Sequence, residues 1–162
     1  MSEKTWGGEP FWGLGYEFDP QWLLTPAQRE LQEKLIALCQ RTLRNNAVES
    51  DKKLLYPRKN FEALAEMGLL GLLVPAELGG MGESHVCSAM VTETIARYGC
   101  PSTAMCYTMH NAAVAAALFR HHDSEMIQDL MRRVDRDCLV GTLSYSDPET
   151  GGQDRKSTRL NS

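Results

Sequence analysis

The chain has 162 residues, of which 43% are hydrophobic, and it carries a formal net charge of −4. This length and composition allow one domain, or one domain and the beginning of a second, with a real hydrophobic core, and the lack of a basic cluster argues against a nucleic-acid partner. The five cysteines form no CxxC pair and no signal-peptide pattern follows Met1, which together indicate reduced core thiols in a cytoplasmic protein.

The N-terminal segment changes character at Thr25. Residues 1–23 are rich in glycine and aromatic residues and carry no helix signal, so we interpret them as an arm that docks its rings on the domain or on a partner subunit. A ligand-stacking role is the alternative. Residues 25–28 then combine a capping threonine, proline at the first helical position and glutamine three residues after the cap, which predicts a helix from Thr25 to about Asn46, with a pattern that can continue for a few more residues.

Two more helices are predicted before residue 100. One begins near Pro57 and is closed by Gly68, and the other is capped by Ser84 and continues to about Tyr98. Between them, an apolar run leads into residues 77–82, where three glycines in four positions predict a tight turn. A phosphate-binding loop is the alternative, but the segment lacks the lysine and hydroxyl residue of a P-loop.

The stretch 102–119 has no glycine, no proline and no charged residue over eighteen positions. A helix this apolar either is buried in a protein interior or spans a membrane. Because polar residues interrupt it and the chain offers no second span, we predict the central helix of a helical bundle and no transmembrane span. We interpret His110, in the middle of this stretch, as a hydrogen-bonded core or interface histidine.

The helical pattern ends near residue 137. A last helix is predicted after a capping Asp123, with five apolar side chains turned inward: Met126, Ile127, Leu130, Met131 and Val134. Residues 138–146 then predict a strand, followed by a turn over 147–152. We therefore predict a helical domain over 24–137 and the start of a truncated β domain over 138–152. Residues 153–162 resemble a translated vector end and are predicted to be a non-native tail.

Two motifs resemble those of one enzyme family. Residues 73–82 read LVPAELGGMG and resemble the VPEEYGGLG signature of acyl-CoA dehydrogenases, and residues 144–152 read SYSDPETGG and resemble that family's TEPxAGSD flavin-binding turn. The likeness covers residues 24 to about 152, and the order and spacing of the motifs fit the family. It implies a mainly α fold, in which a helical bundle like the acyl-CoA dehydrogenase N-terminal domain is followed by the beginning of a β domain.

The resemblance also implies a reaction in fatty acid metabolism. Members of the family remove two hydrogens from the Cα–Cβ bond of an acyl-CoA thioester, as a glutamate takes the α-proton and FAD accepts the hydride. No residue of this chain matches that glutamate, so we assign no catalytic residue and no metal site, and we predict that the fragment alone is inactive. The implied partners are the acyl-CoA substrate, an electron-transfer flavoprotein and further copies of the chain, as a dimer or tetramer.

Nine residues match family positions that contact cofactor or substrate, and Met109 is adjacent to the matching positions on the central helix. In the flavin-binding turn, Ser146 keeps the hydroxyl of the family's usual threonine, whereas Gly152 lacks the hydroxyl of the usual serine. On the central helix, a purely structural role in the core is the alternative for the methionines. The implied cofactor-binding residues are Leu143, Tyr145, Ser146, Gly151 and Gly152, and the implied substrate-binding residues are Ala104, Met105, Thr108, Met109 and Ala112.

Two other functions stay open at this point. An acyl-CoA oxidase or a flavin-dependent monooxygenase would share the fold but would react with oxygen. A non-catalytic helical interaction module would instead form a stable domain that stands alone. The dehydrogenase hypothesis differs from this last one because it predicts exposed apolar surface where a missing helical bundle would pack.

Overall fold

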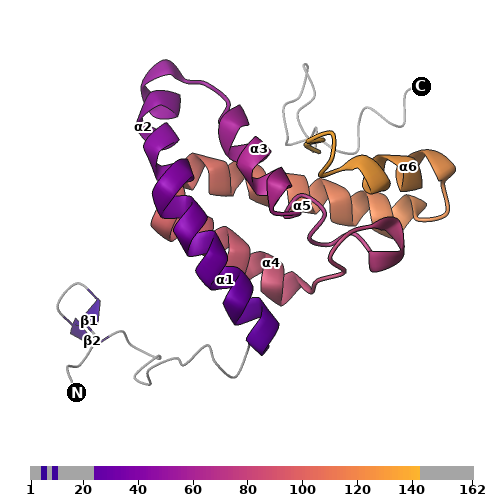
Figure 1. Ribbon diagram of the computed structural model, residues 1–162, viewed down its shortest axis with the longest axis horizontal. Helices are drawn as coiled ribbons and strands as arrows, with labels where there is room; N and C mark the ends of the chain where they lie inside the picture. Colours follow the sequence, from indigo (N-terminus) through magenta and orange to yellow (C-terminus); the bar gives the residue numbers. More distant parts are fainter. Residues whose placement is uncertain (1–4, 7–8, 11–23, 143–162) are drawn as a thin grey trace, which may run out of the picture.

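The computed structural model describes residues 5–6, 9–10 and 24–142 (Figure 1). Within these ranges the chain is mainly helical, which confirms the predicted fold class. Two short strands, β1 (Thr5–Trp6) and β2 (Glu9–Pro10), pair in antiparallel register within the N-terminal arm, where no strand was predicted. The helices are therefore the elements that determine where a site can lie.

The first helical element is longer than predicted. It comprises α1 (Pro26–Leu38), a π-helical turn η2 (Cys39–Leu43) and α2 (Arg44–Lys53). Its predicted start is confirmed, because the Gln28 N–H donates to Thr25 Oγ1 at 3.2 Å and the Thr25 N–H donates to Gln28 Oε1 at 3.1 Å. The predicted end near Asn46 is wrong. The Asn46 side chain donates to Asn60 Oδ1 at 2.8 Å instead, and the helix ends at Leu54, whose φ is +51°.

The next two helices follow the prediction. The helix α3 (Arg58–Glu66) is closed by Gly68 at φ +74°, and a loop over residues 69–83 contains the 3-10 turn η3 (Ala76–Leu78). Ser84 Oγ then accepts the Cys87 N–H at 3.2 Å and caps α4 (His85–Thr94), which continues as the π-helical turn η4 (Ile95–Gly99). A Cβ atom on Gly99 would lie 3.2 Å from atoms of Cys39 in η2, so a glycine allows the two π-helical turns to pack closely.

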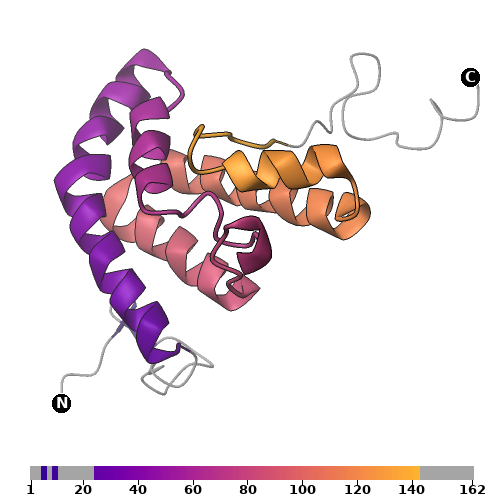
Figure 2. The ribbon, with the colours of Figure 1, turned by 45° about the vertical axis from the view of Figure 1, so that its right-hand side comes forward.

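The longest helix is α5 (Pro101–His121), and α6 (Glu125–Arg133) lies against its second half in both ribbon views (Figures 1 and 2). The predicted cap of α6 is wrong by one residue, because Ser124 occupies that position and makes no side-chain capping bond. Met126 is 69% exposed and Leu130 is also exposed, so these two of the five predicted inward residues face away from the core. Only one narrow face of α6 contacts α5.

The strand that was predicted to begin at Cys138 does not begin there. Cys138 has φ +48°, and the Leu139 N–H donates to the Val134 carbonyl at 2.8 Å, so these residues close α6. Residues 138–142 form no strand in the described part of the chain, and the remainder of the predicted strand, 143–146, lies outside the described residues. This local turn, together with the bond from the Gly141 N–H to His110 Nδ1 on α5, overrides a run that has β propensity.

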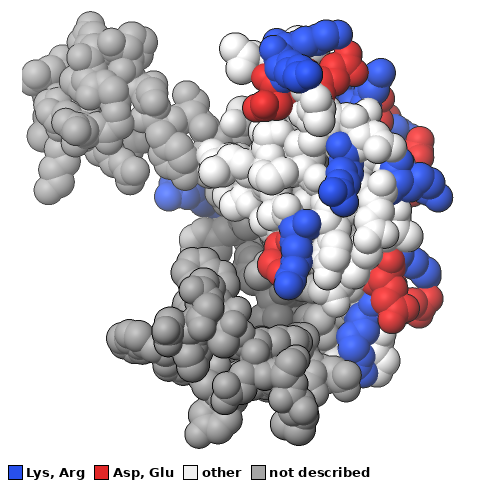
Figure 3. Space-filling view, turned by 90° about the vertical axis from the view of Figure 1, so that its left-hand side faces the viewer, with Lys and Arg blue, Asp and Glu red and all other residues white. Residues whose placement is uncertain are grey.

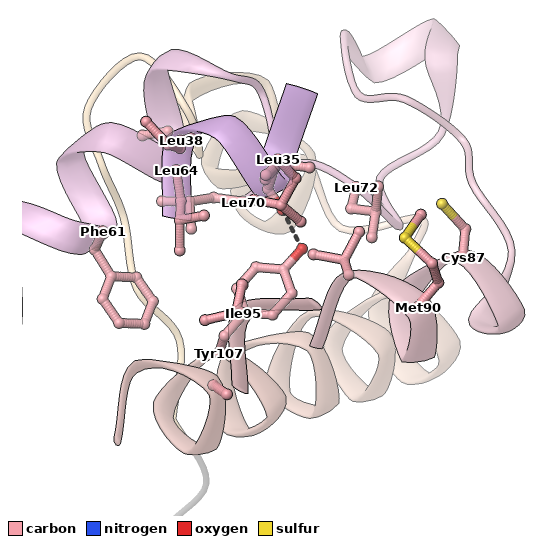
Figure 4. Close-up of a cluster of buried hydrophobic side chains, with 14 of the residues drawn as sticks. Leu35, Leu38, Phe61, Leu64, Leu70, Leu72, Cys87, Met90, Ile95 and Tyr107 are labelled. Atoms are coloured by element: carbon pink, nitrogen blue, oxygen red, sulfur yellow. Dashed lines mark hydrogen bonds between the residues drawn. The ribbon is translucent and has the colours of Figure 1, made fainter. Parts of the chain in front are cut away.

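The core lies where α1, α3, α4 and α5 meet the loop over residues 69–74 (Figure 4). The ring of Tyr107 points from α5 into this cluster, and its hydroxyl donates to the Leu69 carbonyl at 2.7 Å. All five cysteines lie in the described ranges and none is paired in a disulfide, as predicted, but only three of them are buried. The largest fully buried side chains include Tyr107, Phe61, Leu35, Leu43, Leu64, Leu69, Leu70 and Leu72.

The charged side chains lie on the surface in mixed order. On the face shown in Figure 3, Lys and Arg stand beside Asp and Glu rather than in one basic patch of described residues. Exposed ion pairs one helical turn apart, such as Lys34–Glu30 and Arg97–Glu93, account for part of this mixing. In the part of the chain that the structure describes, no helix combines the length and the hydropathy that a membrane span requires.

Candidate functional site

The predicted substrate residues lie on α5, and the structure brings four of the five onto one side of it. Met105 is 67% exposed, Thr108 and Ala112 are exposed, and Met109 is half-buried. Their spacing of three and four residues places them along one face of the helix, which we call the outer face of α5. Ala104 is the exception, because it is only 3% exposed and belongs to the core.

The outer face is apolar in spite of its threonine. The Thr108 hydroxyl donates to the Ala104 carbonyl at 3.0 Å, so its hydrogen-bonding capacity is met within the helix. Phe119, seven residues after Ala112 on α5, is also apolar and is 86% exposed. The sequence predicted that the uncharged helix α5 is buried. This is only half right, because one side of α5 packs against the core and the other side is exposed. Exposed apolar surface of this kind marks a contact site.

The inner side of α5 holds the loop over residues 69–71 through side-chain hydrogen bonds. In addition to the bond from Tyr107, His110 Nε2–H donates to the Leu70 carbonyl at 2.8 Å. The carboxylate of Asp135 accepts the N–H groups of Leu70 and Gly71 at 2.9 and 3.0 Å. The structure thus ties this loop to α5 and to the end of α6, through side chains that are 38 to 65 residues away in the sequence.

The glycine-rich segment forms the predicted tight turn. The N–H groups of residues 79–83 all donate to carbonyl oxygens of residues 71–76, for example Met81 to Gly71 at 3.0 Å and Gly82 to Val74 at 2.8 Å. Because these donors are used inside the loop, they are not directed at a ligand, and the phosphate-binding alternative loses its support. Gly80 is packed most tightly: a Cβ atom there would lie 2.2 Å from the Val74 carbonyl oxygen.

His110 is a hydrogen-bonded core histidine, as predicted. Its ring is fully buried, Nε2–H donates to Leu70, and Nδ1 accepts the Gly141 N–H at 3.0 Å. Accepting at Nδ1 requires that this nitrogen carries no proton, so the two bonds together select the neutral tautomer. Burial lowers the pKa of His110, and the hydrogen bond to the Leu70 carbonyl opposes this only in part.

The depressed pKa predicts a pH dependence of stability. The unfolded chain binds a proton at His110 below about pH 6.5, whereas the folded chain resists it, so the free energy of unfolding should fall as the pH drops below that value. The slope should reach at most about 1.4 kcal/mol per pH unit. Urea unfolding between pH 7.5 and about pH 5 measures it, and the His110→Gln variant should remove this component. Equal slopes in His110→Gln and the parent chain would contradict the assignment.

One buried side-chain oxygen on α5, Asn111 Oδ1, lacks a hydrogen-bond partner among the described residues. Asn111 is buried beside Ala112, its side-chain amide donates to Ser88 Oγ on α4 at 3.0 Å, and its Oδ1 accepts no hydrogen bond among the described residues. Sequence reasoning did not single out Asn111 or Asp135. No local motif surrounds either residue, so the sequence carried no signal for them.

The predicted cofactor residues, 143 to 152, lie outside the described residues. The described chain nevertheless leads toward them from a fixed point, because Gly141 rests on α5. A Cβ atom on Gly141 would lie 2.9 Å from the Ala113 Cβ. Leu143, the first of the predicted cofactor residues, follows Gly141 by two positions in the sequence.

A comparison with known protein families agrees with the first of the two motifs, residues 73–82. The family model of the acyl-CoA dehydrogenase N-terminal domain matches residues 25–135 of this chain, which is more than half of it. The match contains the loop over residues 69–83 and all of α1 to α6. It ends at Asp135, whose carboxylate holds Leu70 and Gly71.

Curated relatives extend the comparison. The short-chain specific acyl-CoA dehydrogenase of Rattus norvegicus is 28% identical over 105 residues, covering 65% of this chain and 25% of the relative. The 3-sulfinopropanoyl-CoA desulfinase of Paraburkholderia xenovorans is 30% identical over 131 residues, or 79% of this chain and 32% of the relative. The isobutyryl-CoA dehydrogenase of Bos taurus is 30% identical over 96 residues, which cover 59% of this chain and 23% of the relative. This chain, which spans about a quarter to a third of the length of these relatives, therefore belongs to the acyl-CoA dehydrogenase family through its N-terminal domain.

Proposed function

We propose that this chain is the N-terminal part of an FAD-dependent acyl-CoA dehydrogenase and that it is inactive alone. The observation that carries the proposal is the match of residues 25–135 to the acyl-CoA dehydrogenase N-terminal domain, and the exposed apolar outer face of α5 supports an acyl site on this helix. An acyl chain and a flavin that react with each other must lie next to one another, and in this proposal the flavin-binding segment follows Gly141, which packs on α5 against Ala113.

In this proposal the outer face of α5 forms one wall of the acyl site. Met105, Thr108, Met109 and Ala112 would contact the acyl chain and exclude water from it, and Ala104 would support the wall from the core. Leu143, Tyr145, Ser146, Gly151 and Gly152 would hold FAD, which supplies the acceptor for the hydride when bound. No residue of this chain is proposed as the catalytic base, because none matches the family glutamate. An electron-transfer flavoprotein and further copies of the chain are the proposed partners.

A spectroscopic experiment tests the cofactor. The protein expressed from its complete gene should purify with the visible absorption of an oxidised flavin, and a saturated acyl-CoA should bleach that absorption under anaerobic conditions. Oxygen consumption by the reduced protein, without an electron-transfer flavoprotein, would favour an oxidase or monooxygenase of the same fold. A colourless protein that takes up no added FAD would contradict the proposal.

The 162-residue chain provides a second prediction. Because it lacks a residue that matches the catalytic glutamate, it should show no turnover of acyl-CoA with an artificial electron acceptor, even when FAD is supplied. The protein from the complete gene is the positive control in the same assay. Measurable turnover by the short chain would show that it contains a base that we have not assigned.

The relative from Paraburkholderia xenovorans supports a second candidate, a desulfinase acting on 3-sulfinopropanoyl-CoA. Its identity of 30% is similar to that of the dehydrogenases, so the N-terminal domain does not separate the two activities. Incubation of the protein from the complete gene with 3-sulfinopropanoyl-CoA and with a saturated short-chain acyl-CoA distinguishes them. Sulfite release would favour the desulfinase, and flavin reduction by the saturated substrate would favour the dehydrogenase.

A further inference from the structure

We infer that His110 is a positioning residue that fixes the start of the flavin-binding segment by holding Gly141 against α5. Its imidazole bridges two distant parts of the backbone: Nδ1 accepts the Gly141 N–H at 3.0 Å, and Nε2–H donates to the Leu70 carbonyl at 2.8 Å. These two residues are separated from His110 by 31 and 40 positions. The inference deepens the proposed function and rests on it, since it concerns the same flavin site.

The imidazole is a rigid support because both of its nitrogens are engaged and its helix is anchored. The ring is fully buried, so water does not compete for either hydrogen bond. Tyr107, one turn earlier on α5, is also fully buried and is tied to the Leu69 carbonyl at 2.7 Å. The loop over residues 69–71 is in turn held by Asp135. These contacts together fix the position of the His110 ring.

Steric fit at Gly141 is a second, independent observation. A Cβ atom on this residue would lie 2.9 Å from the Ala113 Cβ, which is closer than side chains tolerate, so the backbone reaches α5 only because residue 141 is glycine. Two residues earlier, the Leu139 N–H donates to the Val134 carbonyl at 2.8 Å. The chain is thus fixed at Leu139 and again at Gly141, just before the predicted flavin residues begin at Leu143.

Cofactor sites require that supporting contacts hold the backbone to a fraction of an ångström. The hydrogen bond from the Gly141 N–H to His110 Nδ1 holds the chain two residues before Leu143. Loss of this bond would release the backbone at Gly141, from which the predicted flavin-binding segment continues. His110 would act on FAD through the backbone, without contact with the cofactor.

A comparison of two His110 variants tests the inference in the protein from the complete gene. Glutamine carries one acceptor and one donor at nearly the separation of the two imidazole nitrogens, whereas phenylalanine fills the space and makes neither bond. The His110→Phe variant should bind FAD about tenfold more weakly than the parent and should lose protection of the Gly141 amide against hydrogen exchange. The His110→Gln variant should keep both properties within about a factor of two. His121→Gln, at an exposed position on the same helix, is the matched control.

The Gly141→Ala variant disturbs the same contact between Gly141 and α5 by changing Gly141 itself. It replaces His110→Phe in the test if that variant does not fold. It should also weaken FAD binding about tenfold, because the added methyl group meets Ala113. The double variant should bind FAD no more weakly than the worse single variant, because both changes remove the same contact between Gly141 and α5.

The possible results separate this inference from the proposed function. If the parent binds FAD and the His110→Phe and Gly141→Ala variants bind it equally well, the positioning role is wrong and the proposed function stands. If His110→Gln loses FAD as severely as His110→Phe, the two hydrogen bonds do not explain the role and the inference fails. If the parent protein binds no FAD, the proposed function fails and the inference fails with it.

Discussion

Replacement of Gly80 by alanine is expected to lower the free energy of unfolding by about 3 kcal/mol. The added Cβ atom would lie 2.2 Å from the Val74 carbonyl oxygen, 2.4 Å from the Val74 Cβ and 2.7 Å from the Gly71 carbonyl oxygen. Two of these atoms belong to the backbone, so the loop cannot adapt by a change of rotamer. The Gly71 carbonyl also accepts the Met81 N–H, so a shift of the backbone breaks further bonds of the loop.

Gly79 is the matched control for this experiment. It is adjacent in the sequence and has φ +85°, but nothing lies within 4 Å of the position that its Cβ would take. The Gly79→Ala variant should therefore lose only about 1 kcal/mol, from the cost of a left-handed conformation. Urea unfolding of both variants, followed by circular dichroism, measures the difference. Equal losses at the two positions would mean that the loop accommodates a methyl group at Gly80 and that close packing does not explain this glycine.

Replacement of Asp135 by leucine should also lower the free energy of unfolding by about 3 kcal/mol. Its carboxylate accepts the N–H groups of Leu70 and Gly71, and Leu70 is fully buried. Leucine would leave both N–H groups without an acceptor, and a buried donor without a partner costs about 1–3 kcal/mol. Burial raises the pKa of Asp135, but these two N–H groups favour the ionised form and oppose the rise.

Two variants define the contribution of the Asp135 bonds. Asp135→Asn keeps one acceptor oxygen and should lie between the parent and Asp135→Leu in thermal and urea unfolding. Asp137→Asn is the control, because this exposed carboxylate pairs with Arg136 and Arg133, which lower the pKa of Asp137 to about 2. Exposed pairs contribute little to stability, so its unfolding midpoint should stay close to that of the parent. An Asp135→Leu protein as stable as the parent would show that water replaces the carboxylate.

The sequence alone identified the local features of this fold. The capping box at Thr25, the cap at Ser84 and the left-handed Gly68 each depend on groups within a few residues, so their chemistry is readable from a short window. The glycine-rich turn before α4 belongs to the same class. These local signals predicted the order of the helices, and the motif over residues 73–82 was read directly from the sequence. The family match over residues 25–135 agrees with this motif.

Sequence reasoning was less successful where one local signal met a tertiary contact. A helix end predicted near Asn46 was displaced to Leu54, because the Asn46 side chain bonds Asn60 across the bundle. The strand predicted from Cys138 gave way to a turn that closes α6, in which Leu139 bonds back to Val134 and the following Gly141 bonds to His110 on α5. In both cases a backbone preference worth a fraction of a kcal/mol per residue competed with hydrogen bonds that only the folded chain can form.

Only the tertiary structure decided which side of α5 is buried. Eighteen residues without a charge give almost no contrast around the helix, so the sequence determined that α5 is apolar but not how it is oriented. The packing of Tyr107 and His110 against Leu69 and Leu70 sets that orientation and exposes the face that carries Met105. Contacts between residues 38 and 40 positions apart depend on the path of the whole chain, and for this reason no local pattern contains them.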